Sequence, residues 1–142
     1  MAIYSRADRT SNVTTAAACF EIRTTATDRP RIMEIGISLV TAAATVIGLG
    51  RPQAIGITPT SAQIVQAEDT GDPAGTIVTA MAWGTGPTVP LQFFRRWSFP
   101  GTIGAGVIFT FPRGLIVPIS SSIVLWNILG GATLDVYVVI DE

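Results

Sequence analysis

The sequence predicts an all-β fold, a two-sheet antiparallel β-sandwich with a jelly-roll-like arrangement of about eight strands. Apolar and polar residues alternate with a period of two in one segment after another. Gly, Pro and Asp separate these segments, and no stretch shows the period of an amphipathic helix. Strands of this kind, joined by irregular turns, are typical of two stacked sheets, and the jelly roll is the common eight-stranded form.

The length of 142 residues suits one domain with one hydrophobic core. Residues 1–13 are mostly polar, and we expect them to form an N-terminal arm held in place by contact with other protein. Residues 14–142 are predicted to form the single sandwich domain.

The first half of the chain predicts three main strands, with a short fourth strand inside a long loop region. The clearest alternation places Met33, Ile35, Ile37 and Leu39 inward. Thr, Pro and acidic residues dominate between residues 53 and 75 and indicate loops. The predicted strands are residues 14–25, 31–41, 45–51 and 63–66.

Regular alternation returns in the second half. One strand is expected to present Ile77, Thr79, Met81 and Trp83 on one face. The final strand runs almost to the C-terminus with four aliphatic residues on one side, and we expect it to be central in its sheet. The predicted strands are residues 76–83, 91–99, 106–111, 115–117, 123–128 and 133–141.

The chain is 48% hydrophobic and 13% charged, with about half the charged residues of an average globular protein. We therefore expect part of the surface to be covered by copies of the same chain or by a larger partner. The net charge of −1 predicts no attraction to nucleic acid or to an anionic membrane. All nine basic residues are Arg, which suits directional contacts at interfaces but is equally explained by codon bias in a GC-rich genome.

Catalysis is not expected. The chain has no His and no Lys, and Cys19 lies in an apolar strand, so the familiar nucleophile–base pairs are not available. No catalytic residue, metal or cofactor is predicted. The acidic segment 68–72 lacks the spacing of an EF-hand and indicates a solvated turn. The glycine-rich segment 101–106 has no following helix and indicates backbone bends.

No membrane partner is expected either. The uncharged stretch 35–50 is too short to span a bilayer and contains three glycines. The N-terminus lacks the basic and apolar regions of a signal peptide, so synthesis in the cytoplasm of a host is expected.

The most distinctive segment, residues 93–100, interleaves aromatic residues with two arginines. Neighbouring residues of a strand face opposite ways, so either Arg95 or Arg96 should lie among aromatic side chains and need a partner there. Such residues are typical of protein interfaces. The candidate interface residues are Tyr4, Arg6 and Arg9 from the arm, together with Arg95, Arg96 and Arg113.

Aromatic residues also stack on sugars. If the segment binds a ligand, Trp83 or Trp97 is the expected stacking platform.

Several strand-and-turn motifs carry a resemblance to a known class of proteins. They are Arg95-Arg96-Trp97, Phe111-Pro112-Arg113-Gly114-Leu115-Ile116-Val117-Pro118, Leu125-Trp126-Asn127 and Asp135-Val136-Tyr137-Val138-Val139-Ile140, with Pro30-Arg31-Ile32-Met33-Glu34-Ile35-Gly36 and Gly50-Arg51-Pro52 in the first half. Together the chain resembles small jelly-roll virion structural proteins of tailed bacteriophages and prophages.

This resemblance covers most of the chain and implies a role but no particular functional residue. It implies a capsid decoration (cement) protein or a minor virion protein that works as a homo-oligomer, with a trimer favoured. Its implied partners are the major capsid protein or another virion protein, and its implied location is the capsid surface of the virion.

Two other functions remain open at this point. A carbohydrate-binding β-sandwich at a tail or fibre tip would use an exposed Trp83 or Trp97. A ring-forming scaffold unrelated to phage would use the same low-charge surface for self-association.

Overall fold

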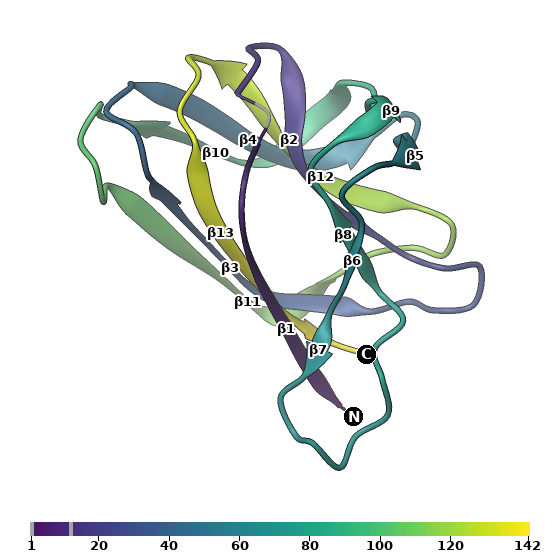
Figure 1. Cartoon of the computed structure of the whole chain (residues 1–142). Helices are drawn as coiled ribbons and strands as arrows, with labels where there is room; N and C mark the ends of the chain where they lie inside the picture. The colour runs from purple at the N-terminus through teal and green to yellow at the C-terminus, as the bar shows by residue number, and fades with distance from the viewer. Residues whose placement is uncertain (1, 12) are drawn as a thin grey trace.

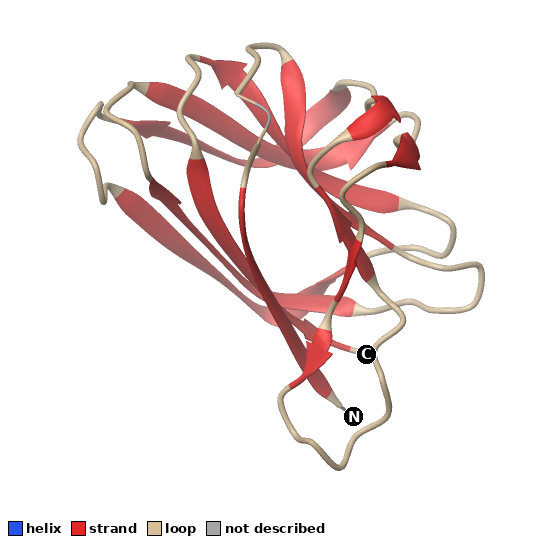
Figure 2. Ribbon diagram, viewed as in Figure 1, coloured by secondary structure: helices blue, strands red, loops and turns tan. Residues whose placement is uncertain are grey.

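The computed structural model describes residues 2–11 and 13–142. Within these ranges the regular structure consists of strands and contains no helix (Figure 2), which confirms the all-β prediction. The strands form a five-stranded sheet, a six-stranded sheet and a small two-stranded sheet, and every pairing between them is antiparallel.

Thirteen strands are present in the described residues, not about eight. The five-stranded sheet has the order β11 (Gly106–Ile116), β3 (Arg31–Leu39), β13 (Leu134–Asp141), β1 (Ile3–Arg9) and β7 (Gln66–Ala67). The six-stranded sheet has the order β10 (Pro90–Phe99), β4 (Thr45–Pro52), β12 (Ser122–Leu129), β2 (Ala17–Arg23), β8 (Val78–Ala80) and β6 (Gln63–Ile64). The small sheet pairs β5 (Ile57–Pro59) with β9 (Trp83–Thr85).

The strands pair in a nested order. The first strand pairs with the last, β2 with β12, β3 with β11 and β4 with β10. The series continues inward with β5 against β9 and β6 against β8. The first half of the chain therefore runs antiparallel to the second half over its whole length, as one long ribbon.

Folding this ribbon over itself creates the sheets. Four further pairings complete the two large sheets: β4 also lies beside β12, β3 beside β13, β2 beside β8 and β1 beside β7. The final strand is consequently central in the five-stranded sheet, as predicted. Figure 1 shows the two large sheets facing each other, with both chain ends beside β7.

The main core fills the space between the two large sheets. The alternation predicted for the last strand is confirmed, because its four aliphatic side chains are at most 2% exposed: Leu134, Val136, Val138 and Ile140. Similar alternate positions from β2, β4 and β12 meet them from the other sheet. Burial of these side chains is the main source of the fold's stability.

In β3, the inward positions change phase near the strand's beginning. Ile35, Ile37 and Leu39 are buried as predicted. Ile32 is fully buried, however, whereas Met33 is only half-buried. A bulge in the pairing of β3 with β13 lies at this point and shifts the alternation by one residue.

The N-terminal segment, expected to be an arm, contains strand β1, which lies between β13 and β7. Tyr4 is buried in the core, and its hydroxyl donates a hydrogen bond to the carbonyl of Pro73. The guanidinium of Arg6 bonds to the carboxylate of Asp8 at 2.7 Å. Met1 and Asn12 also belong to the predicted arm but lie outside the described residues.

The segment between β4 and β10 is anchored to the six-stranded sheet by a buried carboxylate. Glu21 is 0% exposed. One of its oxygens accepts hydrogen bonds from the hydroxyl of Ser122 at 2.7 Å and from the backbone N–H of Gly56 at 3.1 Å. The other accepts one from the indole N–H of Trp83 at 2.7 Å and lies 3.7 Å from the guanidinium of Arg23.

These contacts predict that Glu21→Ala destabilises the protein strongly, because buried donors lose their acceptor and Arg23 loses its counter-charge. The expected loss is about 3–5 kcal/mol of unfolding free energy, measured by urea unfolding followed by tryptophan fluorescence. The matched control is Glu68→Ala at an exposed position, which should change stability by less than about 0.5 kcal/mol. A loss below about 1 kcal/mol for Glu21→Ala would contradict this account.

Candidate functional site

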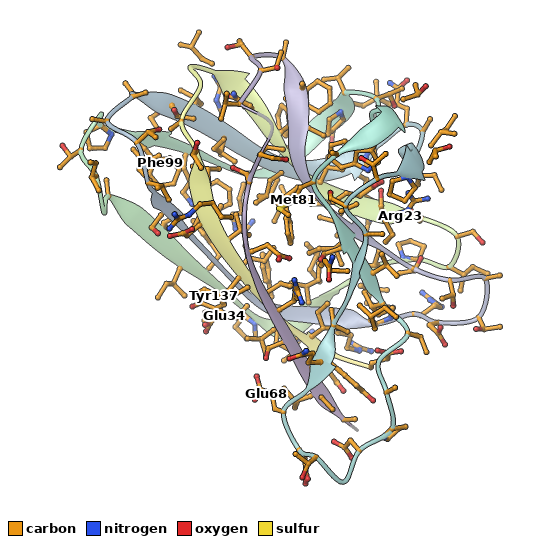
Figure 3. The ribbon with its side chains drawn as sticks, in the orientation of Figure 1. Arg23, Glu34, Glu68, Met81, Phe99 and Tyr137 are labelled. Atoms are coloured by element: carbon orange, nitrogen blue, oxygen red, sulfur yellow. The ribbon has the colours of Figure 1, made fainter. Side chains whose placement is uncertain are left out.

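A shallow groove of about 800 Å³ crosses the outer face of the five-stranded sheet. It exists because small residues occupy this face of β3 and β11, among them Gly36 and Gly106. The ring of Tyr137 lies over Gly36, where a Cβ atom would approach its Cε1 atom to 1.9 Å. Figure 3 shows Tyr137 beside Glu34. The hydroxyl of Tyr137 donates a hydrogen bond to the carboxylate of Glu34 at 2.5 Å. This bond raises the pKa of Tyr137.

Two acidic residues line the groove, but only Asp135 has its carboxylate on the outer face, because the side chain of Asp8 points inward between the sheets. Asp8 bonds to Arg6 and to the hydroxyl of Thr79. Asp135 accepts two hydrogen bonds from Arg9, and these bonds lower the pKa of its carboxyl group. The groove is therefore an open, mainly apolar surface whose acids are neutralised by arginines of the same chain.

Residues 2–11 and 13–142 contain neither a cluster of metal ligands nor a membrane-spanning helix. No group of three or more His, Cys, Asp or Glu side chains in these ranges is placed to hold a metal ion. None of these residues forms part of a helix that is long and apolar enough to cross a membrane.

Cys19 lies in the core and is 2% exposed. Its thiol donates a hydrogen bond to the carbonyl of Leu125 at 3.4 Å. Burial raises the pKa of the Cys19 thiol to about 12. The thiol is thus protonated at neutral pH, and its environment does not favour nucleophilic chemistry.

We predict that iodoacetamide at pH 8.5 modifies Cys19 in the native protein at least about 100-fold more slowly than in urea-unfolded protein, because only the thiolate reacts. The rate is measured by intact-mass spectrometry over time. Equal rates in the two states would show that Cys19 is accessible and ionised in the folded protein.

An arginine cluster occupies one edge of the sandwich, where β10 and β11 are the outermost strands of their sheets. We define this cluster as Arg31, Arg51, Arg95 and Arg113, all of which are exposed. Arg31 donates a hydrogen bond to the carbonyl of Arg113 at 2.9 Å, and Arg51 donates one to the carbonyl of Ile116 at 2.7 Å. These two contacts connect β3 and β4 to the distal part of β11.

Two aromatic rings support the cluster from below. The guanidinium of Arg51 lies 5.0 Å from the centre of the Phe94 ring, and that of Arg95 lies 5.6 Å from the centre of the Phe111 ring. The attraction between cation and ring in each such exposed contact is worth about 0.5–1 kcal/mol. The contacts hold two arginines in fixed positions on the surface.

No member of the cluster forms an ion pair with a carboxylate of the described residues; the ion pairs there involve Arg6, Arg9 and Arg23. Asp141 is the strand partner of Arg31 but does not form an ion pair with it. Four cations held near one another without a counter-charge repel each other. The cluster is therefore a surface that favours an anionic partner.

The conformation of β10 agrees with the sequence-based expectation for Arg95 and differs from it for Phe93. We expected strict alternation to place either Arg95 or Arg96 among the aromatic residues of the core. Pairing shifts around Phe93 interrupt the alternation, so that Phe93 packs on the outer face of the sheet and Phe94 packs against the core. Alternation is regular from Arg95 onward, so Arg95 is on the same side of β10 as Trp97 and lies over the ring of Phe111, whereas Arg96 faces the other side. Both arginines are exposed, because β10 is the outermost strand of its sheet.

The predicted interface residues separate into three groups in the structure. Tyr4 is in the core and Arg6 is paired within the fold, so neither presents a free group to another molecule. Arg9 is exposed but paired with Asp135. Arg95 and Arg113 belong to the cluster, and Arg96 is exposed beside them on β10.

Sequence reasoning did not select Arg31 and Arg51 as site residues. Each precedes or follows a proline at the end of a strand, where a charged residue is expected for solubility alone. Only the pairing of β3 with β11 and of β4 with β10 shows that both belong beside Arg95 and Arg113.

The two candidate stacking residues are largely occupied inside the protein. Trp97 is 8% exposed and packs edge-on against Phe109, with ring centres 4.4 Å apart. Trp83 is half-buried, and its indole N–H bonds to Glu21. Trp97 therefore has no exposed ring face on which a sugar could stack, and only part of the Trp83 ring is accessible.

Comparison with protein families, with curated proteins and with solved structures finds no match to this chain.

Proposed function

We propose that this chain is a structural virion protein of a tailed phage, of the capsid decoration (cement) type. In this role it associates with itself and binds to the shell of the major capsid protein. The observation that carries the proposal is the exposed arginine cluster without carboxylate partners, on a sandwich with few other charges. Such a surface favours contact with other protein over chemistry on a small molecule.

The nested pairing of strands supports a jelly-roll-type fold, which this proposal includes. A jelly roll is an antiparallel ribbon rolled into two facing sheets, so strands from the two halves of the chain alternate within each sheet. Here β4 lies between β10 and β12, and β3 lies between β11 and β13. The small β5–β9 pair occupies the position where the ribbon continues toward its turn.

A cement role requires burial of surface and no reaction. The inert Cys19 thiol and the engaged Asp8 and Asp135 carboxylates fit a protein without catalytic residues or a cofactor. Many copies on one particle add their individual contacts through multivalency, so each single contact can be weak. The proposed location is the outer surface of the capsid, after synthesis in the host cytoplasm.

The proposal predicts binding to shells assembled from the major capsid protein of the genome that encodes this chain. The purified protein should co-sediment with these shells at a fixed ratio to capsid protein and should raise the temperature at which they fall apart. The measurements are sedimentation with quantitative gel analysis and light scattering during heating.

Shells of an unrelated phage serve as the control and should bind no protein. The absence of saturable binding at protein concentrations up to about 50 µM would exclude a cement role on that shell.

A further inference from the structure

A projecting acidic loop lies at the opposite edge of the five-stranded sheet from the arginine cluster. We define it as residues 68–72, which contain Glu68, Asp69 and Asp72 and follow β7. In Figures 1 and 3 it extends beyond the sheets beside both chain ends, and Glu68 is labelled at its base. Glu68 and Asp69 are exposed.

This loop has a defined conformation before any partner binds. The backbone N–H of Glu68 donates to the carbonyl of Ile3 at 2.9 Å, which fixes the start of the loop on β1. The carboxylate of Asp69 accepts a hydrogen bond from the backbone N–H of Gly71 at 2.8 Å, and its carbonyl accepts one from Asp72. A loop that is already ordered loses less entropy on binding.

More negative charge gathers close to the loop. The carboxylates of Glu142 and Asp28 both lie within hydrogen-bond distance of the hydroxyl of Thr76, and Glu142 also accepts a hydrogen bond from the backbone N–H of Thr76. Burial raises the pKa of Tyr4, and the charges of Glu142 and Asp72 add to this shift, which places both acids near its hydroxyl. None of the arginines of the cluster reaches these acids within 4.0 Å.

The two charged regions cannot meet within one molecule. Arg113 of the cluster lies on β11, the outermost strand of the five-stranded sheet, and the acidic loop follows β7 at the other edge, with three strands between them. Neighbouring strands are about 4.8 Å apart, so these edges are separated by about 19 Å. Each molecule therefore has a cationic edge and an anionic edge, and both lack a partner.

We infer that the acidic loop of one copy docks on the arginine cluster of the next copy, in a head-to-tail contact. The receiving surface includes a hollow of about 380 Å³ lined by Phe111, Pro112, Arg113 and Gly114. Three loop carboxylates then face four guanidinium groups, which bind carboxylates with paired hydrogen bonds. This inference rests on the proposed function, and it identifies the two surfaces through which copies of the chain associate.

A second copy is favoured over other anions because the complementary loop is present on every molecule. The overall charge of −1 gives no long-range attraction for nucleic acid. A head-to-tail contact uses two different surfaces, so repetition produces a closed ring when the rotation between copies permits closure. A ring brings several identical faces to a shell at once, as a cement protein requires.

Charge reversal tests the inference directly. Arg95→Glu with Arg113→Glu should weaken self-association at least about 30-fold, and Glu68→Arg with Asp69→Arg should do the same. An equimolar mixture of these two double variants should form mixed complexes, because each supplies one surface that complements the other. Association is measured by sedimentation velocity and by light scattering after size-exclusion chromatography.

Arg96→Glu is the matched control. Arg96 neighbours Arg95 in sequence but faces the opposite side of β10, away from the Phe111 ring that Arg95 contacts. It should leave association unchanged. Thermal melting of every variant shows whether it is folded, and restored association in the mixture shows that both surfaces are intact.

The inference is overturned if the wild-type protein is monomeric at all accessible concentrations, if either pair of reversals leaves association unchanged, or if the mixture does not associate. It is also overturned if Arg96→Glu disrupts association equally, because the contact then lies on another face. Binding of single-stranded oligonucleotide to the cluster in place of a second copy would also overturn the inference, because the cluster would then be a nucleic-acid site. Shell binding is measured separately, so the failure of this contact and the failure of the proposed cement role give different results.

Discussion

The antiparallel pairing of the first half of the chain with the second half is the constraint on which the structure depends. It brings together segments that are distant in sequence, such as β1 and β13 or β2 and β12. Each of these contacts must overcome the entropy of closing a long loop, and cooperative burial of apolar side chains between the sheets supplies the compensation. The final strand is then secured on both sides, and its inward residues are at most 2% exposed.

This pairing leaves β10 and β11 as open edges on the same side of the sandwich. Open edges expose unpaired backbone groups and invite other strands to add to the sheet. Here both strands contain pairing shifts, and prolines and arginines lie at or near them. These features resist the regular addition of another strand. Contacts at this edge must therefore be made by side chains. Such contacts depend on the charge and shape of the partner, whereas strand addition does not.

Much of the sandwich follows from the sequence, and the exceptions have identifiable causes. Alternation located seven of the eight long strands because one face of each is apolar. It did not locate β1, because Arg6 and Asp8 occupy inward positions and satisfy each other there, so the segment reads as polar. Nor did it indicate that Glu21 would be buried, since its partners Gly56, Trp83 and Ser122 lie far away in sequence. The arginine cluster was found only in part for the same reason.

The distribution of charge links the fold to assembly. With only 13% charged residues, the chain has few charges to place, and several neutralise each other within the fold, as in the pairs of Arg6 with Asp8 and Arg9 with Asp135. The arginine cluster and the acidic loop place seven more at two opposite edges. Charges scattered at random over the surface would keep the protein soluble but would not orient two molecules relative to each other. Opposite charges on opposite edges can orient them. Apolar burial thus stabilises the individual sandwich, and in the proposed assembly the few remaining charges would determine how sandwiches are arranged relative to one another.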